Sequence, residues 1–381
     1  MTLKASRRAA IDPFIVMEVM RAANERAASG GDIIHMEVGQ PSTPAPRAVR
    51  EAAQRALDRD LIGYTDALGL PYLRRRIAQH YREFYDVEVD ASRIAVTTGS
   101  SGGFLLAFLA AFDPGDRVAL AMPGYPCYRH ILTALGLEPV LIETGPETKF
   151  QPTIAALEAI PGRLDGLIIA SPSNPVGAVL PAADLAAIAT WCQRKGVRLV
   201  SDEIYHGITY GTHASTASTS ESAIVINSFS KYFSMTGWRL GWMVLPEDLV
   251  KPVERLAQNF FISAPSLSQI AGGAAFDAHE ELQANVARYA QNRELLLNEL
   301  PRAGFVDLVS TDGAFYIYAH VAGLTDDSLD FCRRMLAETG VAATPGIDFD
   351  PARGRHYMRF CFSGATADMA EAARRLITWR K

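Results

Sequence analysis

Side chains that could do chemistry follow two short apolar runs, at the point where each run ends. The run Val197 to Val200 is followed by Asp202, and the run Ala223 to Ile226 is followed by Lys231. An amine can attack a carbonyl carbon and then carry a proton, whereas a carboxylate can hold a cationic ring nitrogen. If both runs are strands of one parallel sheet, these two groups lie at the same edge of that sheet.

Two further predicted strands end in small polar residues. One leads into Gly99, Ser100 and Ser101, and another leads to Asn174. The turn from Gly99 to Ser101 precedes an apolar helix, so free backbone N–H groups and the positive helix end can face an anion. An amine, a carboxylate, an amide and an anion-binding turn are together what a pyridoxal phosphate site requires.

The sequence does not favour several other kinds of site. The turn after Thr97 does not read Gly-x-Gly-x-x-Gly, and Gly-Lys-Ser/Thr is absent, which argues against dinucleotide and P-loop sites. The eight histidines show no metal-ligand spacing, and no Gly-x-Ser-x-Gly turn supports a serine hydrolase. We therefore expect no metal ligands.

The elements that must position these residues form an alternating pattern. Six apolar runs have the length and flanking turns of buried strands: Arg93 to Thr97, Arg117 to Ala121, Gly166 to Ala170, Val197 to Val200, Ala223 to Ile226 and Leu240 to Leu245. Between them lie helix-like patterns such as Ala182 to Lys195. This alternation predicts an α/β domain with a mostly parallel sheet flanked by helices.

The two ends of the chain follow a different rhythm. A long polar helix is expected near Ala284 to Leu300, and a strand near Ala314 to Tyr318. We interpret residues 1–45 as an N-terminal arm and part of a small domain, residues 46–285 as the large domain, and residues 286–381 as the remaining small α+β domain.

Composition limits the class of protein and its partners. The chain has 381 residues, of which 49% are hydrophobic and 21% charged, so it can bury a sizeable core. A net charge of -5 gives no general attraction to nucleic acid or anionic membranes. The four cysteines form no Cys-x-x-Cys pair, no secretion signal is visible, and the most apolar run, Gly102 to Phe112, is too short to span a membrane. A cytoplasmic protein with small-molecule partners is expected.

The residues around Lys231 also resemble a known family. Ser228 to Gly241 reads S-F-S-K-Y-F-S-M-T-G-W-R-L-G, and five other blocks occur in the order of that family. They are Gly63-Tyr64, Pro123-Gly124-Tyr125-Pro126, Ser173-Asn174-Pro175-Val176-Gly177, Ser201-Asp202-Glu203-Ile204-Tyr205 and Met358-Arg359-Phe360. Over nearly its whole length the chain resembles the class I/II aminotransferases, which are fold-type I enzymes dependent on pyridoxal 5'-phosphate.

The resemblance implies a role for each matching residue around the cofactor ring. Lys231 would form the Schiff base and move a proton, and Asp202 would pair with the pyridinium nitrogen. Tyr205 and Asn174 would donate to the phenolic oxygen of the cofactor, and Tyr125 would stack on the ring. The structural alternatives are a solvated lysine, a helix-capping acid, a turn asparagine and core tyrosines.

The resemblance also implies how the phosphate and the substrate are bound. The phosphate ligands would be Ser100, Ser101, Ser228 and Arg239, joined by Tyr64 of a neighbouring subunit. The last of these requires a homodimer with shared sites. Arg359 would bind the substrate α-carboxylate through two parallel hydrogen bonds, with Asn174 touching the same carboxylate and the backbone of Gly39 approaching it.

The activity implied is transfer of an amino group between an L-amino acid and a 2-oxo acid in a two-stage cycle. A carbon–sulfur β-lyase would share Lys231, Asp202 and Arg359, so it stays the alternative, and a ligand-binding regulator would need a DNA-binding domain for which no room exists before Gly39. The substrate stays open. Some bacterial aspartate-specific relatives carry a lysine where Ser100 to Gly102 stand here, which argues against aspartate, while Phe14, Ile15 and Phe261 hint at an apolar side-chain pocket.

Overall fold

Seven strands form the central sheet of the larger part of the molecule. The computed structural model describes residues 3–211, 214–309 and 311–380. The strands, in their order across the sheet, are β2 (Ile94–Thr98), β8 (Leu240–Val244), β7 (Ile224–Ser228), β6 (Arg198–Asp202), β5 (Gly166–Ala170), β3 (Arg117–Met122) and β4 (Glu138–Glu143). From β7 to β4 every neighbouring pair is parallel, whereas β8 runs antiparallel to both β7 and β2. The expected α/β fold with a mostly parallel sheet is confirmed.

All six predicted strands are present, and the sequence pattern missed only β4 in this sheet. β4 is an edge strand whose side chains are mostly half-buried or exposed, and it contains Pro139. A short run with proline and glutamates at both ends lacks the continuous apolar character by which the buried strands were predicted.

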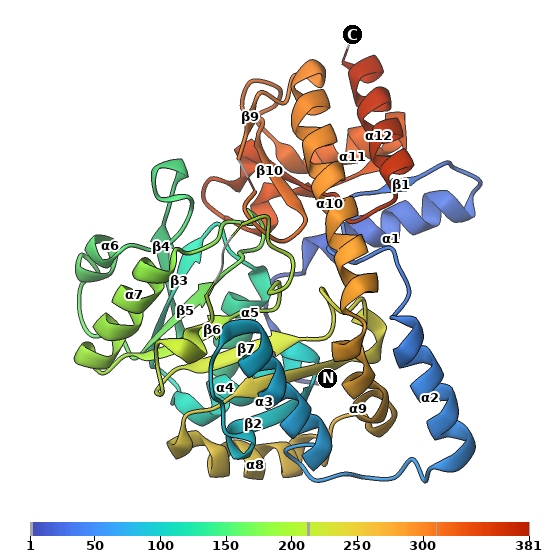
Figure 1. Cartoon of the computed structure of the whole chain (residues 1–381). Helices are drawn as coiled ribbons and strands as arrows, with labels where there is room; N and C mark the ends of the chain where they lie inside the picture. Colours follow the sequence, from blue (N-terminus) through green and yellow to red (C-terminus); the bar gives the residue numbers. More distant parts are fainter. Residues whose placement is uncertain (1–2, 212–213, 310, 381) are drawn as a thin grey trace.

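Helices cover both faces of this sheet (Figure 1), and alternate strand residues pack in different clusters. Ile168 and Val200 pack in one cluster with Phe108 of α4 (Gly99–Ala111). Leu167 and Leu199, their neighbours in sequence, pack on the other face with α7 (Ala182–Lys195). The period of two along each strand therefore builds two separate cores, which hold the strand ends rigidly in place.

Most of the remaining helices of this part lie around the same sheet, whereas the first of them in the chain packs against the last. They are α2 (Arg47–Arg59), α3 (Pro71–Tyr85), α5 (Pro126–Leu135), α6 (Ile154–Glu158), α8 (Glu247–Phe260) and α9 (Ser266–Gly272).

The two ends of the chain meet in a second, smaller unit (Figure 1). Its four-stranded antiparallel sheet has the order β12 (Thr344–Pro345), β13 (Tyr357–Cys361), β10 (Tyr316–His320) and β9 (Asp307–Leu308). Its helices are α1 (Ile15–Ala28), α10 (His279–Glu299), α11 (Ser328–Thr339) and α12 (Thr366–Trp379). β1 (Ile34–His35) pairs in parallel with β11 (Val341–Ala342), which joins the N-terminal segment to the C-terminal part. The divisions at residues 45 and 285 stay predictions.

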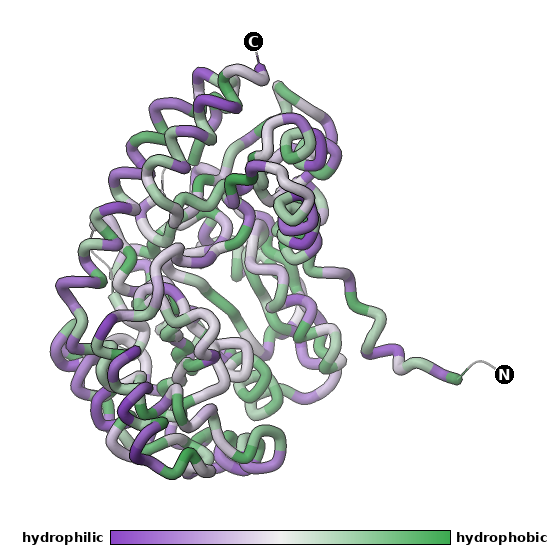
Figure 2. The backbone as a smooth tube through the Cα atoms, turned by 90° about the vertical axis from the view of Figure 1, so that its right-hand side faces the viewer, coloured by the Kyte–Doolittle hydropathy of each residue, from purple (hydrophilic) through white to green (hydrophobic). Residues whose placement is uncertain are grey.

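The segment before α1 is exposed to solvent. The residues before α1 run away from the body of the molecule (Figure 2), and residues 3–13 are exposed.

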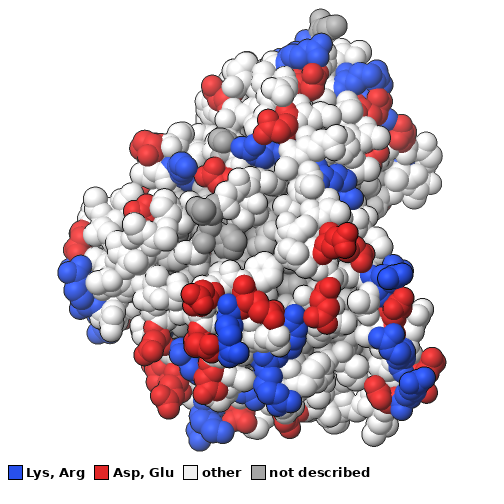
Figure 3. Space-filling model, viewed as in Figure 1, with Lys and Arg blue, Asp and Glu red and all other residues white. Residues whose placement is uncertain are grey.

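On the face shown in Figure 3, basic and acidic side chains are intermixed without a large area of one sign. Among the helices formed by described residues, none is both long and apolar enough to cross a bilayer.

Candidate active site

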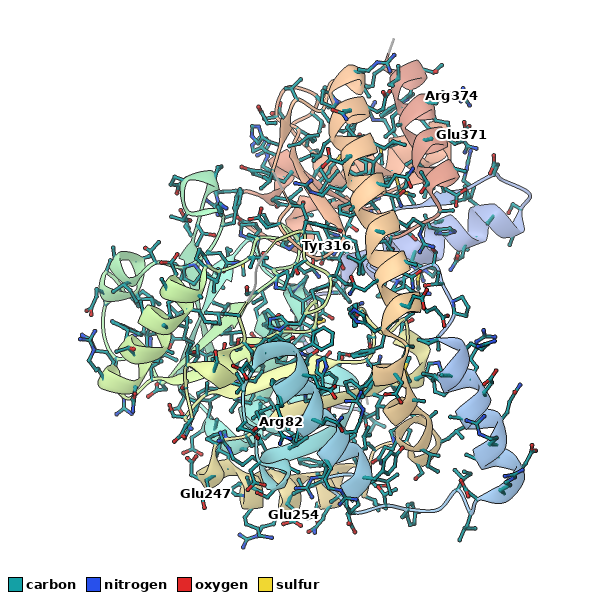
Figure 4. The ribbon with its side chains drawn as sticks, in the orientation of Figure 1. Arg82, Glu247, Glu254, Tyr316, Glu371 and Arg374 are labelled. Carbon is teal, nitrogen blue, oxygen red and sulfur yellow. The ribbon has the colours of Figure 1, made fainter. Side chains whose placement is uncertain are left out.

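A cavity of about 200 Å³ lies beyond the carboxyl ends of β5, β6 and β7, where the large unit meets the small one. Tyr316, which lines it, is labelled near the middle of the molecule in Figure 4, where β10 faces the larger unit. Ten of the predicted site residues line this cavity: Gly39, Ser100, Ser101, Tyr125, Asn174, Asp202, Tyr205, Lys231, Arg239 and Arg359. Gly39 and Arg359, which are 320 positions apart in the chain, are thus brought to one place.

Lys231 reaches the cavity from the turn that follows β7. Its Nζ donates a hydrogen bond to the carbonyl oxygen of Gly39 at 2.5 Å. Although the side chain keeps some exposure within the cavity, burial lowers the pKa of Lys231 to about 8, and the nearby guanidinium of Arg359 acts in the same direction. An amine with this pKa gives up its proton near neutral pH far more readily than an exposed lysine does.

Asp202 is the last residue of β6, and its carboxylate is buried. Oδ1 accepts a hydrogen bond from the N–H of Ile204 at 3.0 Å, and Oδ2 accepts one from the hydroxyl of Tyr128. Burial raises the pKa of Asp202 to about 6, and the hydrogen bond from Tyr128 opposes this rise. Asp202 therefore stays ionised at neutral pH and can accept a further N–H from a group in the cavity.

The N-terminus of α4 and Arg239 together offer donors for an anion. Among the described side chains none caps the first turn of α4, so the N–H groups around Ser100 and Ser101 face the cavity without a side-chain acceptor. Gly99 has φ +65°, and a Cβ built there would overlap the guanidinium of Arg239. Glycine is required here because it has the needed backbone freedom and lets the arginine pack directly on the turn.

Arg359 crosses from β13 of the small unit to the large unit. Its Nη1 donates to Asn174 Oδ1 at 2.8 Å, and its Nη2 donates to the carbonyl of Glu37. Its Cζ lies 4.3 Å from the ring centre of Tyr316 and 4.6 Å from that of Phe349, so the guanidinium is held between two aromatic rings. Nε is buried and has no hydrogen-bond partner among the described residues. A carboxylate in the cavity would provide the missing acceptor.

Tyr205 and Tyr316 line the cavity together. The hydroxyls of Tyr205 and Tyr316 share a hydrogen bond of 2.6 Å, and burial raises the pKa of both phenols. Both therefore stay protonated, and the hydroxyl that accepts the shared hydrogen bond can donate its own proton to a ligand oxygen. A Cβ on Gly39 would overlap the hydroxyl of Tyr316, so the absence of a side chain at Gly39 makes room for this tyrosine.

Two predicted site residues do not line the cavity in the described chain. Ser228 is buried behind Ser230, and its Oγ accepts a hydrogen bond from the N–H of Ser230 at 3.0 Å. Tyr64 lies in the segment between α2 and α3 and is 83% exposed. Of the three apolar residues expected near a substrate side chain, Phe14 lines the cavity, whereas Ile15 and Phe261 do not.

Several residues that line the cavity were not predicted as site residues, among them Tyr128, Ser230, Thr236 and Tyr316. Tyr128 follows Tyr125 by three residues in the first turn of α5, so helical spacing could have indicated it. Ser230 and Thr236 lie within the lysine signature itself. Nothing local marks Tyr316, because it is one of several aromatic residues in a buried strand.

The side chains present fit pyridoxal phosphate. The cavity provides a lysine amine of lowered pKa, a buried carboxylate that accepts N–H groups, and an uncapped helix start beside an arginine. The unpartnered Nε of Arg359 suits the carboxylate of a second, smaller ligand. In each case a group of the cavity complements a part of the ligand in hydrogen bonding or in charge.

The family comparison agrees with this chemistry. Residues 31–376 match the model of the family "Aminotransferase class I and II". The chain is 52% identical to "Valine--pyruvate aminotransferase" of Mycobacterium tuberculosis, over 100% of this chain and 99% of that protein. It is 34% identical to "Aspartate/prephenate aminotransferase" of Thermus thermophilus, over 90% of this chain and 91% of that protein.

Solved structures share both fold and extent. An aminotransferase from Mycobacterium tuberculosis superposes with a TM-score of 0.97 at 52% identity, covering 99% of each chain. An aspartate aminotransferase from Thermus thermophilus with maleate superposes with a TM-score of 0.93 at 30% identity, covering 99% of this chain and 100% of that one. The likeness therefore extends over both units of the molecule.

Proposed function

The chain belongs to the class I and II aminotransferases, and on this premise we propose that it works with pyridoxal 5'-phosphate held at Lys231. It transfers an amino group between an amino acid and a 2-oxo acid. The observation that carries the proposal is the convergence of Lys231, Asp202 and Arg359 on one cavity from three separate strands or strand ends. The relatives named above are all aminotransferases, so the β-lyase alternative finds no support among them.

Each part of the cofactor has a group to hold it. Asp202 would hold the ring nitrogen, and Tyr205 with Asn174 would face the phenolic oxygen. The phosphate would lie against the start of α4 and be bound by Ser100, Ser101 and Arg239, whereas Ser228, which does not line the cavity, would support the turn before Lys231 through its hydrogen bond with Ser230. When bound, the cofactor stores the amino group between the two half-reactions and disperses negative charge from the substrate α-carbon.

Two residues of this chain would then act on the substrate. Arg359 orients the α-carboxylate through its planar guanidinium, which fixes the α-carbon relative to Lys231. The Lys231 amine would hold the cofactor, and once free it would take a proton from the substrate α-carbon and return it elsewhere. A pKa of about 8 leaves a usable fraction of this amine neutral at physiological pH.

The cavity favours substrates with aliphatic side chains. Its lining includes Phe14, Val16, Met17 and Val38. Among the described lining residues the cations are Lys231, Arg239 and Arg359, and each has a task other than binding a second carboxylate. The name of the valine–pyruvate relative agrees with this preference.

A homodimer would complete the site. The segment around Tyr64 exposes a group of large apolar side chains, namely Leu57, Leu61, Ile62 and Tyr64. Such a patch on an otherwise charged surface is typical of a subunit interface. We propose that Tyr64 of the partner subunit reaches the phosphate, and that the enzyme acts in the cytoplasm, which its composition favours.

Borohydride labelling and an amino-donor panel test this function. Reduction of the cofactor-loaded protein should fix the cofactor to Lys231, and Lys231→Ala should lose both label and turnover, while Lys195→Ala on the exposed end of α7 should keep both. Amino acids should yield 2-oxo acids without ammonia. A label on another lysine would contradict the site assignment, and release of ammonia with pyruvate would indicate a lyase.

A further inference from the structure

The apolar wall of the cavity is held by a contact from the far end of the chain. Phe14, Val16 and Met17 stand at the start of α1, and the ring of Phe14 packs edge-on against Tyr125 at 5.8 Å. Phe14 occupies the capping position of α1 but provides no side-chain acceptor for the first N–H groups of the helix. Those groups need a partner from elsewhere.

Asp348 supplies that partner. Its Oδ1 accepts a hydrogen bond from the N–H of Ile15 at 3.2 Å, and its Oδ2 accepts one from the N–H of Val16 at 3.1 Å. The two ends of one carboxylate thus bind two successive backbone groups, which fixes both the position and the rotation of the first helical turn. Asp348 is only 1% exposed, so water does not compete for these bonds.

The loop that carries Asp348 is itself anchored to both units. The carbonyl of Asp348 accepts a hydrogen bond from Arg129 Nη2 at 2.9 Å, and the carbonyl of Phe349 accepts one from the N–H of Gly124 at 3.0 Å. The ring of Phe349 also packs against the guanidinium of Arg359. One short loop therefore fixes the start of α1 relative to the residue proposed to bind the substrate carboxylate.

We propose that Asp348 is a positioning residue that sets side-chain preference, because it holds Phe14, Val16 and Met17 against the side chain of an aliphatic substrate. This inference rests on the proposed function. Asp348 does not line the cavity, so it acts through α1 and not by contact with substrate. Loss of the two hydrogen bonds between Asp348 and α1 should weaken the reaction of an amino acid with a branched side chain, because that side chain contacts Phe14, Val16 and Met17. The reaction of an amino acid with a methyl side chain should be weakened less, because a methyl group barely reaches these residues.

The simpler possibility is that Asp348 only caps a helix and stabilises the fold. Asp327 provides a matched control, because its Oδ1 caps α11 by accepting from the N–H groups of Leu329 and Asp330 at 2.9 and 3.1 Å. It is exposed and does not line the cavity. Asp327→Ala removes a comparable cap without touching α1, so it measures the effect of a lost cap alone.

The test follows the half-reaction of the cofactor-loaded protein with L-valine and, separately, with L-alanine by absorbance. Asp348→Ala should lower the second-order rate constant for L-valine roughly tenfold, while that for L-alanine changes less than about twofold. Asp348→Asn keeps one acceptor and should lie between. Asp327→Ala should leave the ratio of the two constants unchanged.

Amide hydrogen exchange supplies a readout that does not depend on activity. Exchange of the first-turn amides of α1 should be faster in Asp348→Ala and unaltered in Asp327→Ala. An unchanged ratio of the rate constants for L-valine and L-alanine in Asp348→Ala, whether both constants fall or neither does, would overturn the inference. Unaltered exchange at Ile15 and Val16 would overturn it as well. Failure of the wild-type protein to react with either amino acid would instead contradict the proposed aliphatic preference.

Discussion

Burial shifts the pKa values of Lys231 and Asp202, the two side chains proposed to act on the cofactor, in opposite directions. It lowers the pKa of Lys231 to about 8 and raises that of Asp202 to about 6, because a low-dielectric site disfavours both charged forms. The amine is thereby made easier to deprotonate, while the carboxylate stays charged at neutral pH. Neither shift requires a special contact, since desolvation is the largest cause of each. The same cavity thus prepares a base and an acceptor for a ring N–H.

Asp202→Asn tests the acceptor. The amide cannot keep a ring nitrogen protonated, so kcat should fall by about 100-fold or more, whereas cofactor binding through the start of α4 and Arg239 should persist. Single-turnover kinetics and visible absorbance of bound cofactor measure the two effects. Tyr128→Phe removes only the hydrogen bond to the carboxylate and should cost much less. Near-normal turnover in Asp202→Asn would show that the carboxylate of Asp202 has only a structural role.

Arg359→Lys tests recognition of the α-carboxylate. Lysine keeps the charge but loses the planar fork, so kcat/KM should fall for every amino acid by a similar factor, corresponding to roughly 1–3 kcal/mol. Because Arg359 also bonds to Asn174 and the Glu37 carbonyl, thermal unfolding should be measured alongside to separate lost packing from lost binding. A change confined to one substrate would make Arg359 a side-chain selector.

At the scale of elements, the start of α4 is the part most sensitive to shape. The helix begins at Gly99 with a left-handed residue, and its first turn lies against Arg239. The N–H groups proposed to bind the phosphate therefore keep their position beside Arg239 only while residue 99 has no side chain.

Gly99→Ala should weaken cofactor affinity by about tenfold or more, because the added methyl group meets the guanidinium of Arg239 and the backbone conformation is costly for alanine. Gly103→Ala in the same helix is the control, since a Cβ there makes only ordinary contacts of 3.4 Å or more, with side chains of the neighbouring strands. Titration of the apo protein with pyridoxal phosphate measures both. Equal affinities in the two variants would show that the turn at Gly99 does not bind the phosphate.

The elements also explain which parts of the site could be predicted. Lys231, Asp202 and Asn174 each follow a buried strand within a few residues, so a local pattern places them at one edge. Tyr316 and Asp348 act through contacts with residues more than 100 positions away, such as Tyr205 and Ile15, and no local pattern encodes such a contact. Ser228 shows the reverse case, because its match to the signature is clear while its hydroxyl bonds Ser230.

At the scale of the molecule, the site exists only because the two ends of the chain fold back on the middle. Arg359 belongs to the small unit and Lys231 to the large one, and Gly39, near the N-terminal end, accepts the hydrogen bond from Lys231. Any rotation of one unit against the other would therefore change the distance between the carboxylate-binding group and the amine. The segment around Tyr64 adds a third component, because its exposed apolar side chains favour a second copy of the chain.

Mixing two inactive variants tests whether active sites are shared. In a hybrid dimer of Lys231→Ala and Tyr64→Ala chains, one site combines the intact lysine of one subunit with Tyr64 of the partner subunit, and the other site carries both lesions. Random exchange should therefore restore about one quarter of wild-type activity, since half of the dimers are hybrids with one intact site of two. Subunit exchange is verified by mass-tagged chains. If both residues served the same subunit's site, hybrids would contain no intact site, and activity would stay at background.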